Sequence, residues 1–260
     1  MFFNNTIYFL KLLFFSWFLY TAKLNSLQFK GVNMARRSRL LLSGTPLHII
    51  QRGNNRSVCF YSEDDYVFYI NLLQDLAETH DCKVHAWCLM TNHVHLLLTP
   101  GASLSAGLFM KGLGQRYVQY INRTYQRTGT VWEGRYRSCL VQQESYLMAC
   151  YRYIEMNPVR AGMVDHPAEY RWTSYRTNAQ LEPSELITPH DCYIEFGSNT
   201  SERAEVYRRL FKSELQQELI DQIRDATNGN YVFGTAKFAS QIAQTLGKRT
   251  VRALAGRPKK

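Results

Sequence analysis

Two histidines at alternate positions stand out in the segment TNHVHLLL, residues 91–98. If this run is a strand, side chains at i and i+2 point to the same face, so His93 and His95 leave the strand together. Val94 and Leu96 then face the other way, toward a core. Two imidazoles held side by side make half of a metal site, so a third ligand has to come from elsewhere in the fold.

The segment SYLMACYRYIEMNPVRAG, residues 145–162, offers that third ligand. At about 100° per residue, Tyr151 falls within the apolar stripe of a helix, whereas Tyr153 lies about 100° from the centre of that stripe. Asn157 follows Tyr153 by one turn, so a hydroxyl and an amide oxygen could approach the same point. Pro158 leaves the direction of Asn157 open, because a residue before proline is pushed out of helical geometry. On spacing alone, an exposed tyrosine and a helix-ending asparagine are favoured over a nucleophile beside a metal.

The elements that must position these side chains follow the predicted order β-α-β-β-α-β-α. Strands are expected at 47–52, 83–90, 93–100 and 135–141, and helices from the N-cap Ser62 to near His80, over 103–126 and over 144–157. Such an order closes most simply as a ferredoxin-like α+β fold, an antiparallel sheet with helices on one face and the other face open for a ligand. We expect this domain at 34–178. A C-terminal helical extension with a basic tail is expected at 179–260, loop-like from about Tyr175 and helical over 201–226.

Composition points to a polyanionic partner. The chain has 260 residues, a net charge of +10 and 45% hydrophobic residues, so a disordered chain is excluded and a real core is possible. A basic surface attracts phosphate backbones through counterion release. The six cysteines include no C-x-x-C pair, which excludes a zinc knuckle, and they are expected to be small buried hydrophobes in a reducing compartment.

The N-terminus is expected to lie outside the working fold. Residues 2–20 are apolar, but Lys11 interrupts them and no basic region or cleavage site accompanies them. Met34 opens MARRSRLLL, which looks like a cytosolic start. Residues 1–33 are therefore interpreted as a leader upstream of the true start, with a membrane anchor as the alternative.

Three motifs together resemble one family. NHVHLLL matches the His-hydrophobic-His strand of the HUH nucleases, YIEMNPVRAG looks like the single-tyrosine segment of the IS200-like transposases, and GTVWEGRYRS (129–138) completes the pattern of the REP-associated tyrosine transposases. The resemblance runs from about Met34 to Tyr175. It implies that His93, His95 and Asn157 hold a divalent metal ion, Mg²⁺ or Mn²⁺, and that Tyr153 is the nucleophile.

The resemblance also implies a substrate and a place of action. Family members cleave and rejoin single-stranded DNA beside hairpins, such as REP-like or transposon-end sequences, through a 5′-phosphotyrosine that frees a 3′-OH. We therefore expect a cytoplasmic, nucleoid-associated transposase, either a monomer or a homodimer, with no stable membrane partner.

Basic residues interleaved with aromatic rings indicate where DNA would bind. Cations grip phosphates and rings stack on bases, a combination suited to single strands and hairpin ends. Taken alone the rings fit a core better, and the resemblance reverses this for Trp132. AGRPKK (255–260) resembles half of an AT-hook, with a frayed basic tail as the equal alternative. The expected DNA-binding residues are Arg116, Arg123, Arg127, Trp132, Arg135, Arg137, Arg160 and Arg257.

Two other enzyme classes fit less well, and one non-enzymatic function stays open. Histidine-triad hydrolases need a further histidine where Leu97 stands, and relaxases or replication initiators that carry a helicase would show a P-loop. A non-catalytic DNA-binding protein derived from a transposase is the alternative. The base for Tyr153 is also open between the metal, a water and Glu155. The remaining histidines have no partner at metal spacing: His48, His80, His85, His166 and His190.

Overall fold

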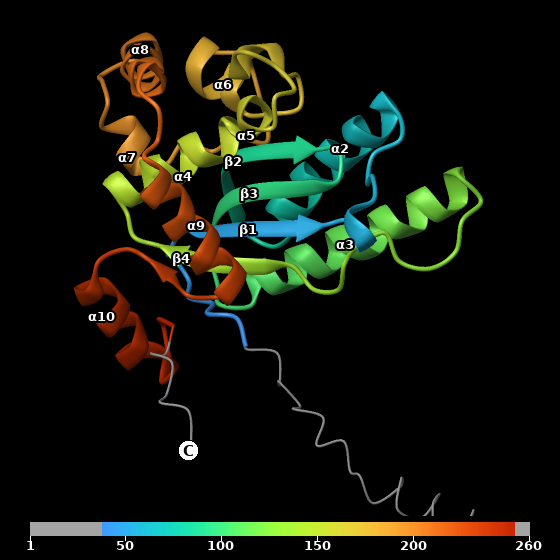
Figure 1. Ribbon diagram of the computed structural model, residues 1–260, viewed down its shortest axis with the longest axis horizontal. Helices are drawn as coiled ribbons and strands as arrows, with labels where there is room; N and C mark the ends of the chain where they lie inside the picture. The colour runs from blue at the N-terminus through green and yellow to red at the C-terminus, as the bar shows by residue number, and fades with distance from the viewer. Residues whose placement is uncertain (1–37, 253–260) are drawn as a thin grey trace, which may run out of the picture. The chain divides into compact units, whose positions relative to one another are not determined.

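The structure, a computed structural model, describes residues 38–252 and is organised around a five-stranded sheet with the order β2-β3-β1-β4-β5 (Figure 1). The predictions for residues 1–33 and for Arg257 lie outside these residues. The strands are β1 (Leu47–Arg52), β2 (Cys82–Met90), β3 (His93–Pro100), β4 (Arg137–Val141) and β5 (Val232–Phe233). The first four pair antiparallel, and β5 runs parallel to β4. The predicted α+β class and the four-strand ferredoxin-like order are confirmed.

The helices in this part of the chain follow the predicted order as far as the third one. Ser62 begins the first of them with a capping box that includes Asp65, as the acidic first turn predicts. The helices are α2 (Glu63–Thr79), α3 (Ser105–Thr124), α4 (Ser145–Glu155), α5 (Asn157–Arg160), α6 (Tyr175–Gln180), α7 (Asp191–Ile194), α8 (Thr200–Arg209), α9 (Gln217–Gly229) and α10 (Ala236–Leu246).

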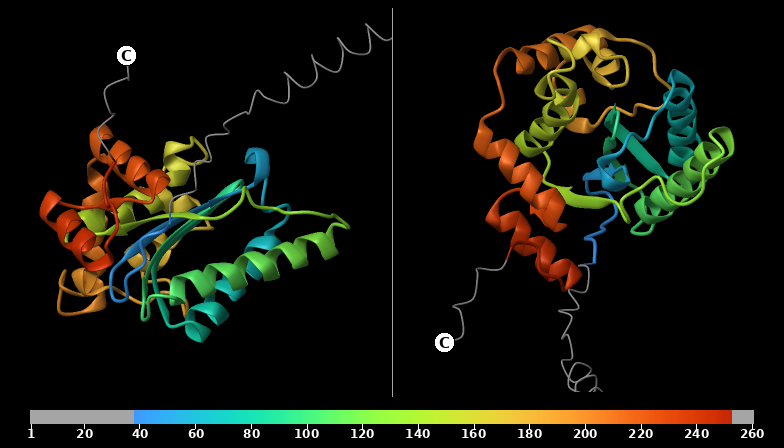
Figure 2. Two further views of the ribbon diagram at one scale, coloured as in Figure 1. Left: turned by 90° about the horizontal axis from the view of Figure 1, so that it is seen from below. Right: turned by 45° about the vertical axis from the view of Figure 1, so that its right-hand side comes forward.

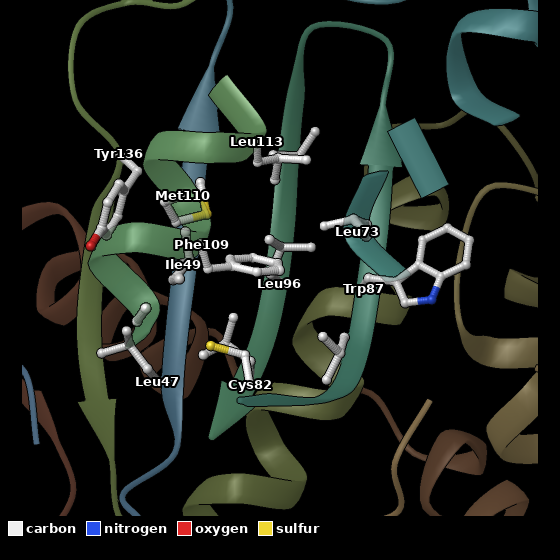
Figure 3. Packing of buried hydrophobic residues seen from close by; sticks show 14 of the residues in the cluster. Leu47, Ile49, Leu73, Cys82, Trp87, Leu96, Phe109, Met110, Leu113 and Tyr136 are labelled. Carbon is white, nitrogen blue, oxygen red and sulfur yellow. The ribbon is translucent and has the colours of Figure 1, made fainter. Parts of the chain in front are cut away.

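One face of the sheet packs against α2 and α3 in an apolar core. Figure 3 shows Phe109 and Leu113 of α3 lying over Ile49 and Leu96 of the two central strands. Gly112 explains how the two helices come close together, because a Cβ there would lie 3.0 Å from a methyl carbon of Leu76. Gly112 lowers the intrinsic helix propensity of α3, but its lack of a side chain allows α3 to pack closely against α2.

The opposite face of the sheet is not open, and that part of the prediction was wrong. α4 and α9 cover it, on the other side of the sheet from α3 (Figure 2, left). The reason lies in the strands, which are apolar on both faces: Leu97, Cys139 and Val141 join a second core with Tyr151 and Ile154 of α4. Exposing such a face would leave that apolar area in water, and burial is worth roughly 25 cal/mol per Å².

The C-terminal region was predicted only in outline. The expected single helical segment over 201–226 is two helices, α8 and α9, because the chain between them is extended at Ser213 and Gln216. Tyr207 of α8 and Ile223 of α9 are both fully buried in the second core, which one straight helix could not achieve from these positions. The segment expected to be loop-like after Tyr175 contains α6 and α7, and β5 extends the sheet beyond the predicted four strands.

Within residues 38–252, no helix is both long and apolar enough to cross a membrane. All six cysteines lie in this range, and each is buried with a free thiol, as expected for small apolar side chains.

Candidate active site

The structure brings the four predicted chemical residues to one cavity of about 290 Å³ between the sheet and the helices on its second face. His93 and His95 come from β3, Tyr153 from α4 and Asn157 from α5. The β3 strand pairs with β1 in a register that sets Arg52 opposite His93. Side chains at directly opposed positions share a face, so β1 contributes to the same cavity.

The ring of Tyr153 lies nearly perpendicular to those of two histidines, His48 and His95. Its ring centroid is 5.7 Å from those of both His48 and His95, and the Arg160 guanidinium stands 4.4 Å from the ring centre. Arg160 also donates a hydrogen bond to the backbone oxygen of Tyr153. Tyr151, two residues earlier, is fully buried in the second core and does not line the cavity. Tyr153 is itself only 6% exposed and belongs to the same core, so the exposed tyrosine that spacing alone favoured was wrong. The two tyrosines differ in that Tyr153 lines the cavity.

The two predicted histidine ligands are neutral at physiological pH. Burial is the main cause, and it lowers the pKa of His93 to about 4 and that of His95 well below its usual value. Positive charge from Arg52 lowers the pKa of His93 further. The Nδ1 atom of His93 lies 2.6 Å from Asn92 Oδ1, and that of His95 lies 2.9 Å from His48 Nε2. In each ring the Nε2 atom remains for another partner.

The third predicted ligand has its nitrogen committed elsewhere. Asn157 Nδ2 donates to the backbone oxygens of Tyr153 and Ile154 at 3.1 and 3.2 Å, an amide orientation assigned from these bonds. Its Oδ1 atom takes no part in these bonds, and the residue lines the cavity. Two neutral imidazole nitrogens and an amide oxygen are a donor set that suits a divalent ion such as Mn²⁺. Among residues 38–252, no group of three His, Cys, Asp or Glu side chains is placed to hold a metal ion, so an ion at this cavity would need the asparagine as well as the two histidines.

Arginines surround the cavity and continue beside it. Arg52, Arg160 and Arg224 line the cavity itself. A small adjacent cavity shares Arg52 and adds Arg135, Arg137 and one acidic residue, Glu133, from the chain that leads into β4. Burial lowers the pKa of Arg160 to about 10, which leaves it charged at neutral pH. Three of the predicted DNA-binding residues, Arg135, Arg137 and Arg160, therefore lie at or next to the predicted chemical centre.

The other predicted DNA-binding residues lie elsewhere. Arg116, Arg123 and Arg127 are exposed on α3 and the loop after it, and they line neither of these two cavities. Trp132 is 3% exposed in the first core, where its ring packs near Tyr69 and Tyr117, so the expectation that it stacks on DNA bases was wrong. Its large apolar area favours burial wherever the fold offers a space.

Sequence reasoning missed four residues at this site. His48 was judged to have no partner, yet its Nε2 atom bonds to His95, and its Nδ1 atom lies 2.9 Å from Thr227 Oγ1. Arg52 shares the strand β1 with His48, and alternation along HIIQR could have placed both on one face. Thr227 and Arg224 come from α9, more than 120 residues beyond β3, and no spacing in the sequence signals their approach.

Glu155, one of the three bases left open for Tyr153, is directed elsewhere. Its carboxylate is fully buried and accepts hydrogen bonds from Ser174, Asn178 and Tyr207. Burial raises its pKa to about 7 despite these bonds. Since Glu155 does not line the cavity, it supports the packing of α4 on α6 and α8 and is not a base for Tyr153.

Comparisons with known proteins agree with this architecture. The family model described as "Transposase IS200 like" matches residues 42–157. A solved structure of a REP-associated tyrosine transposase bound to a REP hairpin is similar in fold, with a TM-score of 0.50 and 14% identity over 60% of this chain and 93% of that one. A candidate transposase from Deinococcus radiodurans R1 gives a TM-score of 0.33 and 19% identity over 41% and 86% of the two chains, too little to carry an argument. No curated protein matches the chain.

Proposed function

Residues 42–157 make the chain a member of the IS200-like transposase family, and on this premise we propose that it cleaves and rejoins single-stranded, hairpin-containing DNA through a 5′-phosphotyrosine. Membership of this family supports the general activity of a DNA transposase. The tyrosine, the metal ion and the hairpin are the finer parts of the proposal. The observation that carries them is the meeting of His93, His95, Tyr153 and Asn157 at one cavity, from three separate elements.

Tyr153 is the proposed nucleophile. Its oxygen attacks the scissile phosphorus, the new Tyr–O–P bond forms, and the bond from phosphorus to the 3′ oxygen breaks. The phenolic proton passes to solvent, and the departing 3′ oxygen takes up a proton to leave a 3′-OH. One phosphoester replaces another, so a 3′-OH can reverse the step and rejoin the strand.

His93, His95 and Asn157 are the residues that would hold the divalent ion, through two Nε2 atoms and one Oδ1 atom. When bound, Mg²⁺ or Mn²⁺ would polarise the scissile phosphate and offset charge in the transition state. The three protein donors are neutral. They therefore add no negative charge near the phosphate, which keeps the site attractive to a polyanion.

The arginines supply the proposed path for the DNA backbone. Arg52, Arg160 and Arg224 line the cavity, and Arg135 and Arg137 continue the positive charge beside it. Each guanidinium can bind a phosphate through two parallel hydrogen bonds. Arg160 has a second role, since its contact with the ring and backbone of Tyr153 restrains the nucleophile.

A hairpin is the proposed form of the substrate because the structurally similar REP-associated transposase is bound to one. The resemblance of the motifs to that group points the same way. Binding of an adjacent hairpin would place a single strand at the arginine-lined cavity, where unpaired nucleotides can follow the charged surface.

The test is a covalent adduct on a denaturing gel. The chain from Met34 is incubated with Mn²⁺ and a 3′-labelled hairpin strand, because the fragment on the tyrosine keeps its 3′ end. We expect a protein–DNA band that Tyr153→Phe and EDTA abolish. Tyr151→Phe is the matched control, since it removes the same atom from a buried tyrosine two residues away that does not line the cavity.

Two outcomes would contradict the proposal. A band that survives Tyr153→Phe would place the nucleophile elsewhere. Tight hairpin binding with no band under any metal would favour the non-catalytic DNA-binding protein.

A further inference from the structure

We propose that His48 and Thr227 are positioning residues, which hold His95 with its Nδ1 atom protonated so that the Nε2 lone pair is left for the cavity. The inference rests on the proposed function for its purpose. Its own content is a hydrogen-bond chain across three elements, Thr227 on α9, His48 on β1 and His95 on β3.

The direction of each bond follows from the first one. Thr227 Oγ1 lies 2.7 Å from the backbone oxygen of Ile223, and a carbonyl can only accept, so the hydroxyl hydrogen is used there. At the second contact, 2.9 Å from His48 Nδ1, the same oxygen must therefore accept. His48 carries its hydrogen on Nδ1 as a result.

The second bond then fixes the tautomer of His95. A neutral imidazole has one N–H, so His48 with a hydrogen on Nδ1 offers Nε2 as an acceptor. That atom lies 2.9 Å from His95 Nδ1, which must donate. The hydrogen of His95 is therefore on Nδ1, and Nε2 carries the lone pair that a metal ligand requires.

The three residues of this hydrogen-bond chain are almost fully buried. His48, His95 and Thr227 are 1%, 2% and 3% exposed, so bulk water does not reach them to replace a lost bond. The two imidazole planes are within 9° of each other, which suits a hydrogen bond in the plane of both rings. Cys139 Sγ lies 3.2 Å from Thr227 Oγ1, and with the hydroxyl hydrogen on the Ile223 carbonyl this thiol is left to donate to the same oxygen.

This hydrogen-bond chain extends beyond the segment that matches the family model. Thr227 lies on α9, outside residues 42–157, so the C-terminal region completes the support of a residue in the catalytic part. Its role is more than binding DNA or packing the sheet.

The first test reads the tautomer directly in the metal-free wild-type chain. Long-range ¹H–¹⁵N correlation spectra distinguish a protonated nitrogen from a bare one in each imidazole ring, and His95→Gln identifies the signals. We expect Nδ1–H for both His48 and His95. An Nε2–H tautomer at His95 would overturn the inference, whether or not the chain cleaves DNA.

The second test uses a matched pair of variants. Thr227→Val keeps the shape but removes the acceptor, and Thr227→Ser keeps the hydroxyl. We expect Thr227→Val to populate the Nε2–H tautomer of His95 and to weaken Mn²⁺ binding, measured by titration without DNA, by about 10- to 100-fold. Thr227→Ser should restore both. Equal tautomers and equal affinities in the two variants would contradict the proposal.

The two proposals fail in distinguishable ways. If the wild-type chain forms no phosphotyrosine adduct but His95 shows the expected tautomer, the proposed function is contradicted and the positioning role of the hydrogen-bond chain stands. An adduct that depends on Tyr153, together with the wrong tautomer at His95, would keep the function and remove the positioning role.

Discussion

Two histidine clusters lie at the same sheet, and the bonds on their ring nitrogens set them apart. The cavity cluster consists of His48, His93 and His95, and the distal cluster of His85 and His190, whose rings are 5.0 Å apart. Burial lowers the pKa in both, to about 4 for His93 and for His85. Burial and neutrality therefore do not separate a reactive histidine from a structural one.

The two clusters differ in which imidazole nitrogens are left without a hydrogen bond. His85 has both nitrogens engaged, Nδ1 with the backbone oxygen of Thr188 at 2.7 Å and Nε2 with Thr99 Oγ1 at 2.8 Å. In the distal cluster His190 accepts from the backbone of Cys192 and caps α7. The cavity cluster instead uses His48 to occupy one nitrogen of His95 and to leave the other. A histidine pair becomes a candidate site when its hydrogen bonds leave lone pairs facing a cavity.

The largest expected effect follows from replacing one histidine in each cluster. His95→Gln should reduce single-turnover cleavage of the hairpin strand by at least about 1,000-fold, since metal stabilisation of the transition state is worth several kcal/mol. His85→Gln should leave the rate within about threefold when both proteins are folded at the assay temperature. A comparable loss in both variants would remove the distinction between the clusters.

Stability should respond in the opposite order. His85→Phe leaves two polar partners without a bond, and we expect it to lower the free energy of unfolding by about 1–3 kcal/mol. His93→Phe should cost less, because His93 is half-buried and its partner Asn92 is partly exposed. Urea unfolding of both variants against wild type measures this. A larger cost at His93 would indicate that the cavity cluster also carries the fold.

Acid should destabilise the protein through both clusters. The unfolded chain takes up protons at histidine near pH 6.5, whereas the pKa values of His85 and His93 are lowered to about 4 in the fold. Between these values the unfolded state binds more protons, so stability falls as the pH drops from about 6.5 to 4. Glu155 opposes this, because its pKa is raised to about 7 and the fold binds more protons there above pH 4.5.

The pH effect can be measured by unfolding in urea at pH 7 and pH 5. We expect the wild type to be less stable at pH 5, and His85→Gln to show a smaller difference between the two pH values because it lacks one titrating group. A difference that is unchanged in His85→Gln would mean that His85 is not among the groups responsible.

The smallest expected effect concerns the charge around the cavity cluster. Arg224→Gln should reduce the salt dependence of DNA binding by about one counterion, because Arg224 lines the cavity. Arg116→Gln, on α3 across the sheet, is the control and should change the slope less. Fluorescence anisotropy at several salt concentrations gives both slopes. A larger effect at Arg116 would place the DNA over α3, as sequence reasoning expected.

Local signals in the sequence were sufficient for the elements up to α4 and for the directions of the central residues. The alternation around His93 and His95 gives their shared face, and the capping signal at Ser62 gives the start of α2. The helical stripe separates Tyr151 from Tyr153. Each of these depends on neighbours within one or two turns, where backbone geometry alone fixes the direction of a side chain.

Long-range packing decided the rest. Trp132 belongs to the first core although arginines follow it at positions 135 and 137, and α4 and α9 cover a face that was expected to be open. Both results follow from apolar area that becomes buried only when distant segments meet. Neither the identity nor the spacing of those residues shows which distant segment will pack against them.

The sequence by itself determined the order of the first four strands and of the helices up to α4, the common face of His93 and His95, and the different directions of Tyr151 and Tyr153 on α4. Only the tertiary structure decided that His48 and Thr227 bond in series to His95 and that Arg52 and Arg224 line the same cavity. The physical reason is range. Side-chain direction within an element is set by local geometry, whereas a hydrogen bond between residues 179 positions apart exists only once the core has brought α9 against the sheet.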